Sequence, residues 1–389
     1  MKTLFVSNLF PDASCPIWGL DNAIILQYLQ RRHEVRVVAT RFDAWIARST
    51  NKLRAREQDL TLSPSYLSIP YIPRVGDRVN PQLYRNRLRN HLTKLREEYP
   101  FDRLLCAWLF PDGWAIKEVA NELQIPFALI AQGSDVHQYL ENPFRRERIV
   151  ETANRSLGVI TRSADLGERL KKAGVHPNIP QTVYNGVDHT LFFPGEKAAS
   201  RKSLSLPEHS VIILYVGNLL PIKQPELIIR AFANFVRQDK LSEARLIMFG
   251  DGPLRTRLER LCNELSIDQN VQILGQAPPE TIAGYMRAAD FLTLASLNEG
   301  VPNVILESLA SGLPVVAPAV GGIPEILHDS ALGIVAPLSR EDDLVQAWKQ
   351  QLNKKVDSNR VAESAQQFTW ERAAESYEKI LSGSSSTPT

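Results

Sequence analysis

Two carboxylates, Glu299 and Glu307, begin and end the nine-residue stretch EGVPNVILE. Gly300 and Pro302 place Glu299 on a loop, and the apolar run that follows predicts a helix over 304–310 that contains Glu307. The N-terminus of a helix offers free N–H groups and a positive dipole end, which together bind anions, most often phosphate. Carboxylates on either side of a phosphate site suit a sugar nucleotide, which has hydroxyl groups on both sides of its diphosphate. Because acidic residues also stabilise a helix start without any ligand, the spacing alone leaves a structural role open.

The composition predicts a globular protein of two or more domains. The chain has 389 residues, of which 44% are hydrophobic and 23% are charged. Its three cysteines, Cys15, Cys106 and Cys262, lack metal-ligand spacing, so we expect neither a zinc site nor a disulfide framework, as in a reducing cytoplasm. We also expect no membrane-spanning helix and no signal peptide, because MKTLFVSNLF leads directly into the first expected strand.

Basic residues are concentrated in the N-terminal half. Residues 1–186 hold 26 Lys and Arg against 19 Asp and Glu, whereas the remainder holds 19 against 24. Part of this charge lies in a helical pattern over 81–98, and Arg145, Arg146 and Arg148 add to it. Such a surface attracts an anionic acceptor or the inner face of a membrane, although an ordinary solvated surface is an equally good interpretation. A nucleic-acid partner is not expected, because basic and aromatic residues do not cluster together.

Strands and helices alternate along the chain, which predicts an α/β fold class with parallel sheets. The pattern starts with a strand at Leu4 to Val6, a helix from about Asp21 to Arg31 and a strand at Val35 to Ala39. It starts again with a strand at Val211 to Val216. A GxGxxG motif is missing from the sequence, which counts against a dinucleotide-binding oxidoreductase.

Polar residues follow several of the expected strands, where ligands bind in parallel sheets. Gln132, Asp135 and His137 follow the strand at 126–130 and should line a cleft, although a single loop histidine is often only polar surface. Gly19 would let the backbone approach a ligand closely. Lys223 follows the strand at 211–216 and would be a point charge for a diphosphate.

The run AADFLTLASLNEGVPNVILESLASGLPVVAPAVGGIPEIL resembles the donor-binding signature of the retaining glycosyltransferases of family 4. The segments FPDGWAIKEVANEL and AQGSDV are similar to the branch associated with exopolysaccharide, capsule and teichuronic acid assembly. The resemblance implies the GT-B fold, in which two Rossmann-like domains face each other across a cleft. It predicts an acceptor-side domain over 1–186, a donor-binding domain over 187–366 and a helix over 367–381 that crosses back to the first domain. The small, polar tail 382–389 should be disordered.

The resemblance also implies an activity. We expect transfer of a hexose from a nucleotide diphosphate sugar, most commonly a UDP-sugar, with retention at the anomeric carbon and without a metal or other cofactor. The acceptor would be a glycan or a lipid-linked glycan in cell-surface polysaccharide biosynthesis. The expected location is the cytoplasm, with peripheral contact at the inner face of the plasma membrane left open.

Family positions give each candidate residue an implied role. Glu307 should bind the ribose hydroxyls, Glu299 should orient the hexose as a catalytic residue, and Lys223 should neutralise the departing phosphate. Gln132 is the third implied catalytic residue, and it would contact the hexose or the acceptor together with Asp135 and His137. The other implied donor-binding residues are Gly19, Asn218, Gly300, Val301, Pro302, Asn303 and Val304, of which Pro302 has no N–H to donate.

Three positions depart from the family pattern. Asn218 stands where the family usually has Arg, Gln132 where it has His or Arg, and Trp18-Gly19 where it often has two glycines. These departures leave open a non-catalytic protein that binds sugar nucleotides on the same fold. A sugar-nucleotide epimerase is a second alternative, although it needs acid and base residues at the donor carbon, and no strong set of these is present.

Overall fold

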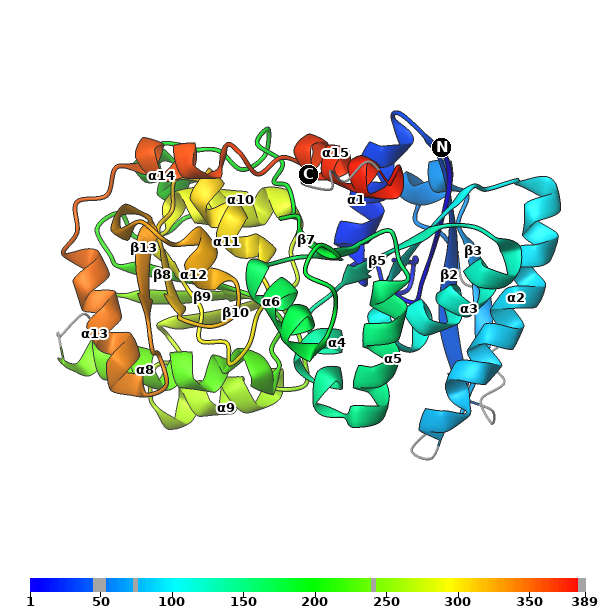
Figure 1. The fold of residues 1–389 in the computed structure, drawn as a ribbon. Helices are drawn as coiled ribbons and strands as arrows, with labels where there is room; N and C mark the ends of the chain where they lie inside the picture. The colour runs from blue at the N-terminus through cyan, green and yellow to red at the C-terminus, as the bar shows by residue number, and fades with distance from the viewer. Residues whose placement is uncertain (45–53, 73–75, 239–242, 384–389) are drawn as a thin grey trace. The chain divides into compact units, whose positions relative to one another are not determined.

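The computed structural model describes residues 1–44, 54–72, 76–238 and 243–383 (Figure 1). These residues form two compact units. The first unit comprises Met1–Asn185 and Trp370–Thr389, and the second comprises Gly186–Thr369. Each unit is an α/β structure with one parallel sheet, so the predicted pair of Rossmann-like sheets is confirmed. The tail predicted to be disordered begins at Ser382, and its residues 384–389 lie outside the described part of the chain.

The sheet of the first unit has seven strands in the order β3-β2-β1-β4-β5-β6-β7, and all neighbouring pairs are parallel. The order reverses direction between β1 and β4, so the loops that follow these two strands leave the sheet next to each other. The strands are β1 Lys2–Ser7, β2 Glu34–Ala44, β3 Ser65–Tyr71, β4 Arg103–Ala107, β5 Phe127–Ala131, β6 Val159–Thr161 and β7 Pro180–Thr182.

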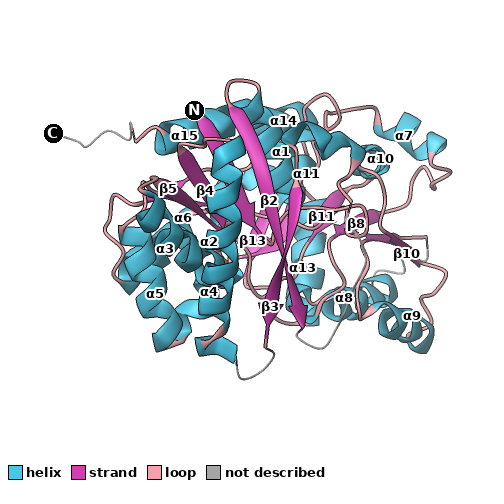
Figure 2. Cartoon of the chain, turned by 90° about the vertical axis from the view of Figure 1, so that its right-hand side faces the viewer, coloured by secondary structure: helices cyan, strands magenta, loops and turns pink. Residues whose placement is uncertain are grey.

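Helices of the first unit pack against two apolar clusters. One cluster joins α2 and α3 to the sheet, and the other joins α1 and α15, which lie side by side (Figure 1). Figure 2 shows α2 running alongside β2 and β3. The helical segments are α1 Leu20–Gln30, η1 Glu57–Leu62, η2 Gly76–Arg78, α2 Asn80–Glu98, η3 Leu109–Gly113, α3 Trp114–Leu123, α4 Ser134–His137, η4 Tyr139–Glu141, α5 Pro143–Asn154, α6 Ala164–Ala173 and α15 Trp370–Leu381.

The sheet of the second unit has six parallel strands in the order β10-β9-β8-β11-β12-β13. Its order reverses between β8 and β11. The strands are β8 Ile212–Val216, β9 Arg245–Phe249, β10 Val271–Gly275, β11 Phe291–Thr293, β12 Val315–Pro318 and β13 Gly333–Ala336. The helical segments are α7 Lys197–Ser203, η5 Pro221–Lys223, α8 Pro225–Gln238, α9 Arg255–Glu264, α10 Pro279–Ala288, α11 Asn303–Ala310, α12 Ile323–Ile326, η6 Ser330–Leu332, α13 Glu341–Leu352 and α14 Ser358–Ala365.

Membrane-spanning helices and metal-ligand groups are both absent from the described residues. Within the four described ranges, none of the helices is both long enough and apolar enough to cross a membrane. The same residues contain no group of three or more His, Cys, Asp or Glu side chains placed to hold a metal ion.

Candidate functional site

The candidate donor site lies at the carboxyl end of the second unit's sheet, where the strand order reverses. Lys223 ends the short helix η5 in the loop after β8, and Glu299 lies in the loop after β11. Because β8 and β11 are neighbours in the sheet, residues 76 positions apart in the chain come into contact here. In open α/β sheets this reversal point is the usual position of a ligand.

Lys223 and Glu299 form an ion pair, with 2.5 Å between Nζ and Oε1. The side chain of Glu299 is only 10% exposed and that of Lys223 is 26% exposed, so water screens the pair less than it would on an open surface. Each side chain thus balances the charge of the other. A diphosphate next to Lys223 would draw the cation away and leave Glu299 as a hydroxyl acceptor.

Close backbone contacts fix the loop that carries Glu299. Leu297 donates its N–H to the carbonyl of Ile222 at 2.9 Å, which joins this loop to the Lys223 loop. On its other side, the N–H of Gly322 donates to the carbonyl of Gly300 at 2.8 Å. Gly321 has a φ of +52°, and a Cβ at this position would lie 1.8 Å from the Glu299 carbonyl oxygen. Only glycine therefore allows the loop after β12 to pack so closely on Glu299.

Helix α11 starts at Asn303, directly after the Glu299 loop. Pro302 precedes the helix in an extended conformation, and the N–H of Ile305 donates to its carbonyl. The predicted phosphate-binding segment, Gly300 to Val304, therefore consists of the loop and the first helical turn. The helix dipole places a partial positive charge at this end, on the same side as Lys223.

Glu307 lies on the second turn of α11 and is partly buried. Burial raises the pKa of its carboxyl group to about 7, because removal from water disfavours the charged form. A carboxyl group with this pKa is poised between its ionised and neutral forms near neutral pH. It can therefore accept hydrogen bonds from a ribose once it is ionised.

Asn218 follows Gly217 in the loop after β8, and its side chain is exposed. Its carbonyl oxygen accepts hydrogen bonds from the Tyr215 hydroxyl at 3.0 Å and from the N–H of Leu220 at 2.9 Å. Burial and the nearby Glu299 carboxylate raise the pKa of Tyr215, so its hydroxyl remains a donor. The position that the family fills with Arg thus belongs to this loop, but it supplies no cation.

Gln132 and Gly19 occupy the carboxyl end of the first unit's sheet. The side-chain amide of Gln132 donates to Asn22 Oδ1 at 3.2 Å, and Asn22 is fully buried. Gly19 has a φ of +70°, and a Cβ there would lie 2.3 Å from the backbone of Leu9. The contact with Leu9 therefore requires glycine at this position, and the predicted close approach to a ligand remains a prediction.

Asp135 is held by the backbone of its own loop and of the loop after β4. Its carboxylate is fully buried and accepts hydrogen bonds from the backbone N–H groups of Leu109, Gln132 and Gly133 at 2.9–3.0 Å. Burial raises the pKa of Asp135 to about 6. Both of its oxygen atoms accept hydrogen bonds from backbone donors, so Asp135 orders the loop after β5, and its predicted contact with the hexose or the acceptor remains a prediction.

His137 lies at the end of α4, and its Nε2 is 3.9 Å from a carboxylate oxygen of Asp165. Its neighbours in a surface groove are residues of α4 and α6, including Arg169 and Lys172. Its predicted contact with an acceptor remains a prediction.

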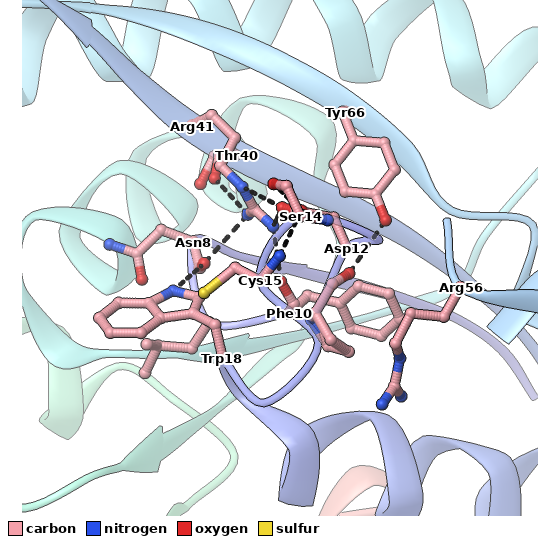
Figure 3. A network of polar contacts seen from close by, with 12 residues as sticks. Asn8, Phe10, Asp12, Ser14, Cys15, Trp18, Thr40, Arg41, Arg56 and Tyr66 are labelled. Carbon is pink, nitrogen blue, oxygen red and sulfur yellow. Dashed lines mark hydrogen bonds and ion pairs between the residues drawn. The ribbon is translucent and has the colours of Figure 1, made fainter. Parts of the chain in front are cut away.

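The loop after β1 is held by a polar network that sequence reasoning did not find (Figure 3). The guanidinium of Arg41 donates to Asp12 at 2.8 Å and to the carbonyl oxygens of Asn8, Phe10 and Thr40 at 2.6–3.1 Å. The indole N–H of Trp18 also donates to the Asn8 carbonyl, at 2.9 Å. The network fixes the loop that starts at Asn8. The available signal was the position of Asn8, two residues after the expected strand at Leu4 to Val6.

Two glycosyltransferase profiles match this chain, one in each half. The profile of Glycosyltransferase Family 4 matches residues 24–191, and the profile of Glycosyl transferases group 1 matches residues 196–368. The D-inositol 3-phosphate glycosyltransferase of Saccharomonospora viridis is 32% identical over 282 residues. That match covers 69% of this chain but 65% of the relative, which is less than two thirds of its length.

Solved structures share the fold at low sequence identity. Sucrose-phosphate synthase from Thermosynechococcus elongatus has a TM-score of 0.76 at 19% identity, with 98% of each chain covered. HepE of Anabaena in complex with UDP-glucose has a TM-score of 0.74 at 20% identity and covers 98% of this chain and 99% of its own. These matches show that the overall fold is GT-B. The finer resemblance to the exopolysaccharide branch is not shown by these relatives.

Proposed function

Because this chain belongs to glycosyltransferase family 4, we propose that it transfers a hexose from a nucleoside diphosphate sugar to an acceptor hydroxyl with retention at the anomeric carbon. The observation that carries the proposal is the Lys223–Glu299 ion pair at the strand reversal, with Glu307 on the adjoining helix. This arrangement supplies one cation for a diphosphate and two carboxylates for hydroxyl groups. A sugar nucleotide needs both.

The proposed roles follow the chemistry of each side chain. Lys223 holds the diphosphate and neutralises the charge that develops on the departing phosphate, together with the N-terminus of α11. Glu299 accepts hydrogen bonds from the hexose and orients it. Glu307, further along α11, binds the ribose hydroxyls. The departing phosphate takes the proton of the acceptor hydroxyl, so the reaction needs no side-chain base in the second unit.

UDP is the proposed carrier, since HepE is a structural neighbour solved with UDP-glucose. The acceptor is proposed to be a glycan or a lipid-linked glycan in cell-surface polysaccharide assembly. The name of the Saccharomonospora relative adds a phosphorylated cyclitol to the acceptors worth testing. The cytoplasmic location, with contact at the inner membrane surface, is proposed from the cysteine pattern and the basic N-terminal half.

A panel of UDP-, GDP- and ADP-sugars tests the proposal with the purified full chain. We expect one donor to raise the melting temperature and to be hydrolysed slowly in the absence of acceptor. Lys223→Ala should weaken binding of that donor about tenfold or more, because a charge-assisted phosphate contact is lost. Lys202→Ala is the matched control, because Lys202 is an exposed lysine on α7.

Each other result has a definite meaning. Binding of a nucleotide without hydrolysis or transfer, even with a membrane extract as acceptor, would indicate the non-catalytic binding protein, for which Asn218 and Gln132 are the supporting departures. Epimerisation of the donor sugar would indicate the epimerase. Absence of nucleotide binding would refute the roles of Lys223, Glu299 and Glu307.

A further inference from the structure

A buried arginine, Arg162, lies in the first unit directly after strand β6. It is only 5% exposed, and its guanidinium pairs with a carboxylate oxygen of Asp21 at 3.4 Å. It also donates to the side-chain oxygen of Asn185 and lies 5.9 Å from the centre of the Tyr377 ring. A buried ion pair is weak evidence for stability, because removal of both charges from water can cost more than their attraction provides. Stability alone therefore does not explain a charged side chain at this position.

Arg162 shares one hydrogen-bond acceptor with Gln132, namely Oδ1 of the fully buried Asn22. The guanidinium of Arg162 and the side-chain amide of Gln132 each donate to this oxygen at 3.2 Å. A carbonyl oxygen has two lone pairs, so it can accept both hydrogen bonds at once. Asn22 thus connects the buried arginine to the residue that is predicted to contact the hexose or the acceptor.

The orientation of the Asn22 amide is determined by two of its neighbours. Its Nδ2 donates to the carbonyl oxygen of Leu9 at 2.9 Å. A carbonyl group can only accept and a guanidinium can only donate, so Leu9 and Arg162 both require the same orientation of Asn22. In this orientation the oxygen of Asn22 faces Gln132. Gln132 must therefore turn its own amide nitrogen toward Asn22.

The Gln132 side chain is left with its oxygen as a free acceptor. Across the described ranges of the chain, no donor contacts Gln132 Oε1. The residue is only partly buried, and Oε1 is not one of the buried atoms that lack a partner, so a ligand can reach this oxygen. A hydroxyl group can donate to Oε1, whereas an ionised phosphate oxygen, which is itself an acceptor, cannot.

We propose that Asn22 and Arg162 are positioning residues for the transfer reaction, which fix the Gln132 amide so that it presents its oxygen to a substrate hydroxyl. The inference rests on the proposed function and adds to it the polarity of the Gln132 contact. Asp21 and Asn185 hold the guanidinium, and the guanidinium holds the Asn22 oxygen in place. The hydroxyl belongs to the hexose or to the acceptor, and the experiments separate these two sources.

A double-mutant cycle tests the positioning role with the full chain and the donor identified above. Asn22→Ala should lower kcat/KM for transfer at least about tenfold, because the Gln132 amide loses its partner and can turn. In the Gln132→Ala background, the same substitution should change kcat/KM less than about threefold, because no amide remains to be positioned. Equal losses in both backgrounds would overturn the proposal, since a purely structural role acts independently of Gln132.

Asn80→Ala is the matched control, because Asn80 is also a buried asparagine of the first unit. Its side chain pairs with both the N–H and the carbonyl oxygen of Ile72 at 2.9 Å, and neither hydrogen bond involves Gln132. Any effect of Asn80→Ala on kcat/KM should therefore be the same with and without the Gln132→Ala substitution.

Arg162→Lys is the second variant, and it carries the test if the melting curve of Asn22→Ala shows that this variant does not fold. It keeps a positive charge near Asp21 but lacks the planar group that reaches Asn22 and Asn185 together. It should therefore lower kcat/KM only where Gln132 is present. The same loss in the Gln132→Ala background would contradict the proposal.

The source of the hydroxyl follows from a comparison of two reactions. Donor hydrolysis without acceptor involves only the hydroxyl groups of the hexose, whereas transfer involves those of the acceptor as well. A loss of both activities in Asn22→Ala would assign the hydroxyl to the hexose, and a loss of transfer alone would assign it to the acceptor. Full retention of both activities in this variant would refute the positioning role.

An NMR measurement separates this inference from the proposed function, because it needs neither donor nor turnover. The glutamine side chains of the full chain are labelled with nitrogen-15, and the Gln132 signals are identified by their absence from Gln132→Ala. Asn22→Ala should move these signals toward those of exposed glutamines, whereas Asn80→Ala should leave them in place. This movement in a protein without transferase activity would support the positioning and contradict the proposed function. Active transfer, with Gln132 signals that do not move in Asn22→Ala, would support the transferase and contradict the positioning.

Discussion

At the scale of single residues, the proposed role of Glu307 predicts that donor binding depends on pH. Its pKa of about 7 means that the carboxyl group is largely protonated below pH 6. Since ribose hydroxyls donate to the ionised form, the affinity for the donor should rise with pH up to about 8 and then level off. Below pH 7 the affinity for the donor should fall by up to about tenfold for each pH unit.

Isothermal titration between pH 5.5 and 8.5 measures this effect. Glu307→Gln should bind more weakly at pH 8 and should lose the part of the pH dependence that belongs to this carboxyl group. The nucleotide phosphates also titrate in this range, so the comparison between variant and wild type is the decisive one. Parallel pH profiles of the two proteins would exclude Glu307 as the titrating group.

Asp112 and Asp135 are buried aspartates of the first unit that should respond differently to removal of their charge. Burial raises the pKa of Asp112 to about 7, far above the ordinary value of 3.8. Between these values the folded state keeps a proton that the unfolded state has lost, so stability falls as pH rises from about 4 to 7. The loss is at most about 4 kcal/mol for this shift. Asp112→Asn should therefore be more stable than the wild type at pH 8 and about equally stable at pH 4.

The contrast between the two aspartates lies in their hydrogen bonds. One oxygen of Asp112 has no partner, so an amide nitrogen can replace it. Both oxygens of Asp135 accept backbone N–H groups, so the amide nitrogen of Asp135→Asn would face a donor and destabilise the loop at every pH. Chemical denaturation at pH 4 and pH 8 measures both variants. Equal effects of the two substitutions would contradict this account.

At the scale of elements, the loop after β12 positions Glu299. Gly321→Ala would bring its Cβ within 1.8 Å of the Glu299 carbonyl oxygen, in a left-handed conformation that alanine disfavours. The variant should therefore lose about 1–3 kcal/mol of stability or more and bind the donor several-fold more weakly.

Gly284→Ala is the control, because Gly284 lies inside α10 with open space around it. This variant should gain about 0.5–1 kcal/mol of stability. Thermal melting with and without donor measures both effects, and unaltered donor binding in Gly321→Ala would show that the loop does not control Glu299.

Local sequence patterns predicted the elements but not the contacts between them. The helix predicted over 304–310 is α11, one residue longer at its start, because turn and helix signals act over a few residues. The helix predicted over 81–98 is α2, which starts one residue earlier and buries Tyr84, Leu88 and Leu92 fully. The Lys223–Glu299 pair could not be read from the sequence, because it depends on the strand order that makes β8 and β11 neighbours.

The loop after β5 shows why the site was predicted only in part. Sequence reasoning placed Asp135 and Gln132 at the end of a strand, and the structure agrees. Whether such a residue faces a ligand depends on where nearby N–H groups point, and this is decided by the folded loop. The contact between Arg41 and Asp12 was missed for a related reason, since the two residues are 29 positions apart in the sequence.

At the scale of the whole molecule, the first unit is made from two separate parts of the chain. Helix α15 contributes Trp370, Tyr377 and Ile380 to the apolar cluster that includes α1, and Arg32 pairs with Glu375 and Glu378 on the same helix. The second unit is continuous from Gly186 to Thr369. We therefore expect a fragment of residues 186–369 to fold and to bind the donor nucleotide, whereas residues 1–185 alone should remain largely unfolded.

Circular dichroism and thermal melting of the two fragments test this expectation. Addition of a peptide spanning 367–383 should restore cooperative melting to the 1–185 fragment. In the full chain, Tyr377→Ala should cost about 3–5 kcal/mol, because it removes a fully buried aromatic side chain. Cooperative melting of residues 1–185 without the peptide would show that α15 is dispensable.

The ion pair between Lys223 and Glu299 also bears on how the enzyme releases its product. In the proposed roles, a sugar nucleotide would replace both partners, since its diphosphate would neutralise the lysine and its hexose would donate hydroxyl groups to the glutamate. The nucleotide that remains after transfer would keep the diphosphate but lack the hexose, so Glu299 would again compete for Lys223. The proposal therefore predicts that the ion pair opposes binding of the product more strongly than binding of the substrate.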